Sequence, residues 1–596
     1  MYLQKYFVMN QIAPLPTVYC CKSKNRTYIR TYKNSRVDGK SYPVKTNIRN
    51  IAEIANGNGV GRLIFREDFL KEHPLFINRP VVRVFDENSG KYVFKYADLN
   101  EVQAAELGEE QKVSGVKSVG LYYVCKEQLN SDPLLKTLKS VFAKSWEKLL
   151  SLGMFCADEG DFRADHYSRY AQEHRLPYKE SLTTSQITRL FQSITETNVF
   201  NFFSEYTTCL YESSTLSRRR FWALDSTSIS TYSGFLDAKY GHSKQGEDLP
   251  QVNVMMLTDE QSHRPLFYEK FNGSIPDVST VVSAFNTLLH IKTKSFVAVM
   301  DRGYYSLSNL KEILATGFHF VVCVPFRKVI EYDDVIENAQ RAFISGNCYD
   351  STIGQNVYTE MHSTEIKDSK TRKNHKHNFY VHVFHSPETA GAQTELLLKR
   401  RADVLKMLKD GVELDGANQD FAKEFIITSE DKTYSFNNAA FQNANNHAGI
   451  FVLLSDTIGE GKTAYQAYKA RESVEDCFKD LKVKMNCNRF GVSTEQSLTG
   501  KCFVEFIALT IRMLMQYRLQ CLKNKGKKVP HNSFKRIIDE LNGIQEIEFT
   551  SGYIAVKPVS KVQQECLKLF RVNTPSDRYD NNLAFSNRLK KASKPH

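Results

Sequence analysis

The chain has 596 residues, 41% of them hydrophobic and 25% charged, which is enough for two to four globular domains with substantial cores. Its 80 Lys and Arg outnumber its 67 Asp and Glu, and the net charge of +13 favours a polyanionic partner such as nucleic acid, although many soluble proteins are mildly basic without one. The 12 cysteines form no CxxC pair or zinc-ligand pattern, no apolar run is long enough to span a membrane, and no signal peptide is evident. These features argue against a zinc site, a disulfide framework and a membrane protein, and they predict a soluble cytoplasmic protein.

Residues 1–130 alternate short runs rich in Tyr, Val, Ile and Phe with turn signals, which predicts a β-rich N-terminal domain. Within it, RTYIRTYK at 26–33 interleaves cations with aromatic rings, so one face of this strand is expected to be basic. That face could contact DNA, but the same charge is equally consistent with an edge strand that is protected against further pairing.

Residues 131–220 are predicted to be helical. LTTSQITRLFQSI at 182–194 has a Thr/Ser cap before an amphipathic helix and could form half of a helix-turn-helix, although most such segments are ordinary packed helices. We interpret 131–220 as a helical DNA-binding region.

From residue 221 onward strands and helices alternate, so the predicted fold class is α/β. The first part of this core is 221–325 and the second part is 463–520. Between them lies a long, polar block at 326–462, which is β-biased in places and which we interpret as a β-rich insertion. Residues 521–596 are predicted to form a basic helical C-terminal region with a basic tail.

Two acidic residues end predicted buried strands. Asp225 follows the apolar run FWAL, and Asp301 follows FVAVM. Side chains at the carboxyl ends of neighbouring strands converge, although an isolated Asp at such a position is usually a turn or helix-cap residue. The pair becomes more specific because a helix with a further acid follows.

That helix is YQAYKARESVEDCFKDLKVK at 465–484. Its residues Tyr468, Arg471, Glu475 and Lys482 follow one another at steps of three, four and seven, so they share one side of an ideal helix. Helix faces rich in Glu, Lys and Arg are usually solvated surfaces with weak ion pairs. The alternative is a carboxylate that holds a metal beside a phosphate, with cations that bind the DNA backbone around it.

Three converging carboxylates repel one another and would raise each other's pKa unless a cation lies among them. Mg²⁺ or Mn²⁺ would relieve the repulsion, because hard divalent ions prefer oxygen ligands. Two such ions roughly 4 Å apart can activate a water or 3′-hydroxyl and stabilise the leaving oxygen of a phosphodiester.

The blocks LDSTSI at 224–229 and VMDRGYYS at 299–306, with the spacing Y-x2-R-x3-E-x6-K, resemble the DDE transposases of bacterial insertion sequences. The subgroup with the Tyr-Arg-Glu-Lys signature, of the insertion sequence four and sixteen-thirty-four type, is the most similar. GHSKQGEDLPQVNVMML at 241–257 also resembles a stretch of that group, with Gln245 in place of the usual Asp.

The resemblance implies a ribonuclease H-like catalytic core with a β-rich insertion between the second Asp and the Glu. It also implies cleavage of the inverted repeats at transposon ends and joining of the 3′-hydroxyls to target DNA, by a homodimer in a synaptic complex on double-stranded DNA in the bacterial nucleoid. The implied catalytic residues, which would bind two Mg²⁺ or Mn²⁺ ions, are Asp225, Asp301 and Glu475. The implied phosphate-binding residues are Tyr468, Arg471, Lys482 and Arg302.

In related enzymes an aromatic residue of the insertion stacks on a base that flips out during hairpin formation. Both tryptophans, Trp146 and Trp222, lie outside 326–462. Phe379 or Tyr380 is therefore the expected substitute, because any flat ring can stack on a base.

Two other functions remain open on the sequence. One is a ribonuclease H-like nuclease with another role, which would give no joined product in a strand-transfer assay. The other is a decayed or domesticated DNA-binding protein that no longer cuts, against which the intact acids and signature argue.

Overall fold

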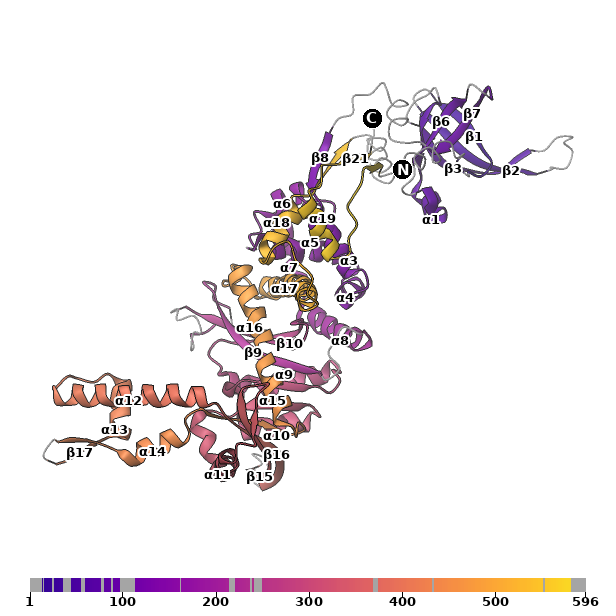
Figure 1. Cartoon of the computed structure of the whole chain (residues 1–596). Helices are drawn as coiled ribbons and strands as arrows, with labels where there is room; N and C mark the ends of the chain where they lie inside the picture. Colours follow the sequence, from indigo (N-terminus) through magenta and orange to yellow (C-terminus); the bar gives the residue numbers. More distant parts are fainter. Residues whose placement is uncertain are drawn as a thin grey trace. The chain divides into compact units, whose positions relative to one another are not determined.

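The computed structural model is shown in Figure 1. It divides into two compact units, each described separately below. The larger unit comprises Gln128–Ser168 and Glu180–Cys521, and it contains every predicted site residue. The smaller unit comprises Met1–Glu127, Arg169–Lys179 and Leu522–His596. The residues that the structure describes are 13, 15–23, 26–35, 44–54, 59–76, 80–86, 89–96, 113–160, 162–213, 220–235, 238–240, 249–367, 374–430, 433–549 and 552–579.

A nine-stranded sheet forms the centre of the larger unit, as far as the described residues show. Strands β9, β12 and β13 are parallel to one another, and the remaining pairings are antiparallel. The prediction of a mixed α/β fold is therefore confirmed. In order across the sheet, the strands are β11 (Pro265–Asn272), β10 (Gln251–Asp259), β9 (Phe221–Ser230), β12 (Val297–Met300), β13 (His319–Cys323), β19 (Ile450–Ser455), β16 (Asn374–His385), β15 (Gln355–Lys367) and β14 (Tyr349–Asp350).

Helices complete the core of this unit. Helix α17 is buried almost continuously from Ser497 to Met513. Within the described ranges, no helix is both long enough and apolar enough to span a membrane. Apart from the helices between β16 and β19, which are described below, the helices that lie wholly or mainly in this unit are α4 (Pro133–Val141), α5 (Trp146–Glu159), α7 (Thr184–Gln192), α8 (Glu196–Glu212), α9 (Asp277–His290), α10 (Leu307–Ala315), α11 (Asp333–Ile344), α15 (Gly461–Ala470), α16 (Glu472–Lys479) and α17 (Glu495–Asn524).

The helical region before the sheet is part of the same core. The cap predicted at 182–194 is confirmed, because Thr183 and Gln186 form a capping box at the start of α7. Helix α8 buries Phe203 against Phe506 of α17, with ring centroids 5.2 Å apart, so it is a core helix.

A buried ion pair also joins this region to the sheet. Arg264, on the turn between β10 and β11, donates to both carboxylate oxygens of Asp132 at 2.8 and 2.6 Å and to the Tyr206 hydroxyl at 2.7 Å. The side chain of Arg264 is 1% exposed. Because the pair is buried, water cannot replace these bonds, and removing either partner would leave the charge of the other unpaired.

The block at 326–462 contains both sheet strands and helices. Its strands β14, β15, β16 and β19 belong to the central sheet. Between β16 and β19 the chain forms a helical arm with a small core of its own around Val404, Phe421 and Phe425 (Figure 1). The elements of this arm are α12 (Pro387–Lys409), α13 (Gly416–Phe425), β17 (Ile426–Thr428), β18 (Tyr434–Phe436) and α14 (Asn438–Asn446).

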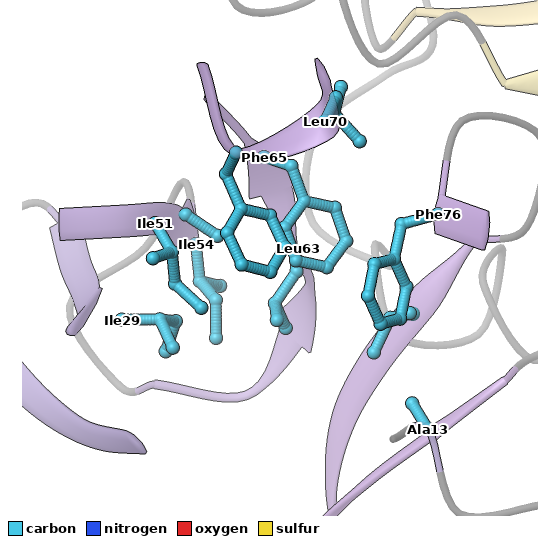
Figure 2. Close-up of a cluster of buried hydrophobic side chains, with 11 residues drawn as sticks. Ala13, Ile29, Ile51, Ile54, Leu63, Phe65, Leu70 and Phe76 are labelled. Carbon is cyan, nitrogen blue, oxygen red and sulfur yellow. The ribbon is translucent and has the colours of Figure 1, made fainter. Parts of the chain in front are cut away.

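The smaller unit is built on short antiparallel sheets. One has the order β1 (Val18–Ser23), β2 (Arg26–Ser35), β3 (Val44–Ile54) and β5 (Ile64–Phe65); another has β4 (Gly61–Arg62), β6 (Val81–Asp86) and β7 (Lys91–Tyr96); a third has β22 (Arg578–Tyr579), β21 (Tyr553–Val556), β20 (Gln545–Phe549) and β8 (Val113–Ser118). Its helices are α1 (Glu67–Glu72), α3 (Gly120–Leu129), α6 (Tyr167–Glu173), α18 (Phe534–Asn542) and α19 (Lys561–Leu569). The core of its N-terminal part gathers Ile29, Ile51, Leu63, Phe65 and Phe76 (Figure 2).

Candidate active site

The two predicted aspartates lie on neighbouring strands. Asp301 directly follows β12, but Asp225 lies in the middle of β9, so the expectation that it ends a strand is wrong. Strands β9 and β12 are parallel and Leu224 pairs with Met300, so the residues that follow, Asp225 and Asp301, are adjacent across strands spaced about 4.8 Å apart. All of β9 is buried except Asp225, which is partly exposed. Asp301 precedes the short 3₁₀ turn η2 (Arg302–Tyr304), but its side chain makes no capping bond there. The ordinary role of a helix-cap residue therefore does not account for Asp301.

The helix predicted over 465–484 is divided at Arg471. The Arg471 N–H bonds to the Tyr468 carbonyl at 3.3 Å, and the Val474 N–H bonds to the Arg471 carbonyl at 3.1 Å. These three-residue bonds tighten the backbone, so α15 ends and α16 begins at this residue. A π-helical turn, η4 (Asp480–Lys484), then ends the segment. The signature residues thus lie on two short helices and a wide turn instead of one ideal helix.

Arg471 links the acids of the site. Its Nη1 lies 3.3 Å from Oδ2 of Asp225, and its Nη2 lies 2.7 Å from Oε1 of Glu475. Burial disfavours its charge, but the attraction of Asp301 and then Asp225 outweighs this, so the pKa of Arg471 is raised. Its Nε is buried and has no hydrogen-bond partner among the described residues. The guanidinium is therefore the cation among these carboxylates, and its own hydrogen bonding is incomplete.

Two tyrosines orient the aspartates. The Tyr468 hydroxyl donates to Oδ1 of Asp301 at 3.0 Å, and the Tyr304 hydroxyl makes a longer contact of 3.5 Å with Oδ1 of Asp225. Burial, followed by the nearby Cys323 and Asp301, raises the pKa of Tyr468, so this phenol stays protonated and remains a donor. Sequence reasoning missed Tyr304, although it lies in the VMDRGYYS block, because only the 3₁₀ turn after Asp301 directs its ring back to β9.

The other predicted residues lie around this group. Lys482 Nζ donates to the Ser228 carbonyl at 2.7 Å, further along β9. Arg302 lies on η2 beside Asp301 and is exposed. Arg471 thus contacts both Asp225 and Glu475, and Tyr468 contacts Asp301. The structure places Lys482 on the backbone of β9 and Arg302 on the exposed rim.

Residues 216–511 match a family model described as "Transposase DDE domain". The match supports a DDE transposase. Among curated proteins, none matches the chain in sequence. A solved structure, described as a cryo-EM structure of the piggyBac transposase synaptic complex with hairpin DNA, is similar at 11% identity and a TM-score of 0.34, covering 82% of this chain and 85% of its own. A TM-score of 0.34 is too low to bear on the fold.

DDE transposases generally use divalent metal ions, which require several oxygen ligands close together. Among the described residues, no three His, Cys, Asp or Glu side chains gather as a metal site would need. The Arg471 guanidinium contacts both Asp225 and Glu475. The donor set itself fits, because carboxylate oxygens are the ligands that Mg²⁺ and Mn²⁺ prefer and a cation already balances their charge. The side chain of Glu475 is 52% exposed, which leaves it free to rotate away from Arg471.

The structure corrects one expectation about the transposase insertion. Phe379 is fully buried and packs against Phe320, with ring centroids 5.6 Å apart, so its proposed stacking on a flipped base is wrong. Its side chain lies on the face of β16 that is covered by the core. Tyr380 lies on the opposite face and is only partly buried, so its role stays a prediction. The loop with Gln245 belongs to residues 241–248, which lie outside the described residues.

Proposed function

We propose that this chain is a DNA transposase of the bacterial insertion-sequence type, which cleaves transposon ends and joins their 3′-hydroxyls to target DNA. The observation that carries the proposal is the adjacency of Asp225 and Asp301 on neighbouring parallel strands, with Arg471 tying Asp225 to Glu475. The order of these strands and of the helix with Glu475 supports a ribonuclease H-like core. The spacing from Tyr468 to Lys482 supports the subgroup with the Tyr-Arg-Glu-Lys signature.

Asp225, Asp301 and Glu475 would hold the divalent ions, two Mg²⁺ or Mn²⁺ per site. When bound, such ions activate the attacking water or 3′-hydroxyl and stabilise the leaving oxygen. Tyr468 holds the Asp301 carboxylate by a hydrogen bond at 3.0 Å, which limits its rotation. Tyr304 restrains Asp225 more weakly from the other side.

Arg471 has a second set of partners in this proposal. A guanidinium donates through a planar fork that suits a phosphate as well as a carboxylate. In the free protein this fork is turned toward Asp225 and Glu475, while its Nε lacks a partner among the described residues. A DNA phosphate that takes over Arg471 would complete its hydrogen bonds and release both carboxylates. Lys482 and Arg302 would add point charges near the same backbone.

Two transposon ends require two active sites, so we propose a homodimer in a synaptic complex on double-stranded DNA. The protein would then act in the bacterial cytoplasm, on the DNA of the nucleoid. The net charge of +13 supports a DNA partner.

The test uses duplexes that carry the DNA flanking the reading frame. Asp225→Asn, Asp301→Asn and Glu475→Gln should each abolish Mn²⁺-dependent cleavage while DNA binding in a mobility-shift assay persists. Glu472→Gln is the matched control, because it removes an exposed acid from the same helix, and it should cleave at the parental rate. A triad variant that cleaves as fast as this control would show that its carboxylate does not take part. If precut DNA ends give no joined product, the protein is a nuclease and not a transposase.

A further inference from the structure

In the four-stranded sheet β1-β2-β3-β5, one face of the first three strands carries cations and aromatic rings together. In the strand register, Tyr19 lies opposite Arg30, and Arg30 lies opposite Asn50. Tyr28, Arg30 and Tyr32 alternate along β2, so they point to the same side. Lys45 joins them from β3, opposite Asn34. We call this set, Tyr19, Tyr28, Arg30, Tyr32, Lys45 and Asn50, the basic face.

The opposite side of the same sheet is the core side. Ile29, between Tyr28 and Arg30, is fully buried and packs in the cluster with Ile51, Leu63 and Phe65 (Figure 2). The residues of the basic face are instead partly or fully exposed. Strand alternation therefore separates one dry side from one solvent-accessible side that carries the charges.

The position of β2 removes the alternative explanation for its charges. A charged strand protects a sheet only when it forms the edge. The sheet order is β1-β2-β3-β5, so β2 is paired on both sides and is not an edge. Charges on a central strand do not block further pairing, so the expectation of edge protection is wrong for this strand.

The first 100 residues of the sequence are strongly basic. Residues 1–100 contain 17 Lys and Arg against 8 Asp and Glu, a net +9 out of +13 for the whole chain. Strands β1, β2 and β3 contain a single acid, Glu53, which is 6% exposed and pairs with Arg26 at 3.2 Å. The remaining face has no acid of these strands to neutralise it, which suits a polyanion.

Two tyrosine rings of the basic face contact the ammonium group of a lysine. Tyr19 and Tyr32 pack edge to face with centroids 5.5 Å apart, and the Lys45 ammonium lies 4.1 and 4.7 Å from their centroids. Because an ammonium already covers these rings, they are poor platforms for unstacked bases. Arg30 is positioned too, since its Nε donates to Asn50 Oδ1 at 2.6 Å. Cations held in place in this way suit the phosphates of a DNA backbone.

We infer that the basic face is a docking surface for the sugar–phosphate backbone of duplex DNA, separate from the site at Asp225. The inference shares with the proposed function only the class of partner. It requires neither cleavage nor a metal ion, so binding in EDTA tests it independently of catalysis.

The experiment measures the full-length chain by fluorescence anisotropy with a labelled 40-base-pair duplex of random sequence, in EDTA, from 50 to 200 mM KCl. Each lost phosphate contact makes the slope of log K against log[salt] shallower by about 0.9. Arg30→Gln/Lys45→Gln should therefore flatten the slope by about 1.8 and weaken binding roughly 10- to 60-fold at 0.1 M salt. Arg30→Lys/Lys45→Arg should restore the parental slope, because both charges are kept.

The matched control removes the same charge from the same sheet region but not from this face. Arg49 pairs with Asp68 and Glu72, and Lys71 is exposed on α1, so Arg49→Gln/Lys71→Gln should keep the parental slope. Equal slopes for the face variant and this control would overturn the inference. So would a labelled single-stranded 40-mer that binds more tightly than the duplex and depends on Arg30 and Lys45. Circular dichroism checks that each variant is folded, so that a shallower salt dependence can be assigned to lost phosphate contacts.

Discussion

Replacing Arg471 should make the stability of the protein depend on a divalent ion. Arg471→Gln removes a guanidinium that lies 3.3 Å from Asp225 and 2.7 Å from Glu475. At an effective dielectric constant near 20, each contact represents about 5 kcal/mol of attraction before desolvation is subtracted. Breaking a fully buried pair costs about 3–5 kcal/mol, and the half-exposed Glu475 reduces this, so we expect a loss of about 2–4 kcal/mol in EDTA.

Adding 5 mM Mn²⁺ should then restore much of the loss. An ion present at 100 times its dissociation constant stabilises the folded state by about 2.7 kcal/mol. In the parent the ion has to displace Arg471, so the same addition should stabilise it less. The measurement is the free energy of unfolding in urea, with and without Mn²⁺, for both proteins.

Arg264→Gln is the control for this prediction. It also removes a guanidinium, but from the lone carboxylate of Asp132, where a single acid gives a divalent ion little to bind. This variant should be destabilised and should gain no more from Mn²⁺ than the parent. If Arg471→Gln responds to Mn²⁺ no more than Arg264→Gln does, the three carboxylates do not form a cation site.

Three further outcomes follow from single contacts. Tyr468→Phe should slow cleavage about tenfold, because a hydrogen bond of about 1–1.5 kcal/mol that orients Asp301 is lost, and single-turnover kinetics checks this. Gly500→Ala should lower the free energy of unfolding in urea by about 1–3 kcal/mol, because the added Cβ would lie 2.4 Å from the backbone of the neighbouring helix. Gly391→Ala is the control: its added Cβ meets open space, so this variant should be neutral or slightly stabilising. Burial raises the pKa of Glu269 from 4.5 to about 7, so the folded state holds its proton more tightly than the unfolded state. The contribution of this group to the free energy of unfolding should be greatest below pH 4.5 and should be lost as pH rises through 7, by about 2 kcal/mol after allowance for screening. Glu269→Gln should remove this loss when the free energies of unfolding at pH 5 and pH 8 are compared.

The acids were found from the sequence because each follows a short apolar run, FWAL or FVAVM, and such runs indicate buried strands. Only β12 ends where its apolar run ends, whereas β9 continues through polar residues to Ser230. That β9 and β12 are adjacent and parallel is a property of the sheet, which no local pattern contains. The break at Arg471 was missed for a similar reason. Helical periodicity assumes ideal turns, whereas two three-residue hydrogen bonds divide this helix.

The same limit explains why the sequence left β2 and Phe379 undecided. The alternation in RTYIRTYK shows which side chains share a face, but whether the strand is central or at an edge depends on its neighbours. Phe379 shows the converse case. A phenylalanine in a polar, histidine-rich segment is compatible with either face of β16, and only the packing against Phe320 decides it.

The buried pair of Arg264 and Asp132 sets a lower limit on any fragment used for expression. A recombinant segment cut to the matched range, 216–511, keeps Arg264 but discards Asp132 and Tyr206, both of which hold its guanidinium. A permanently charged group would then be left inside an apolar interior, with Phe506 also deprived of Phe203. Such a fragment should aggregate on production. One that begins before α4 keeps these contacts and is the better starting point for crystallisation or binding work.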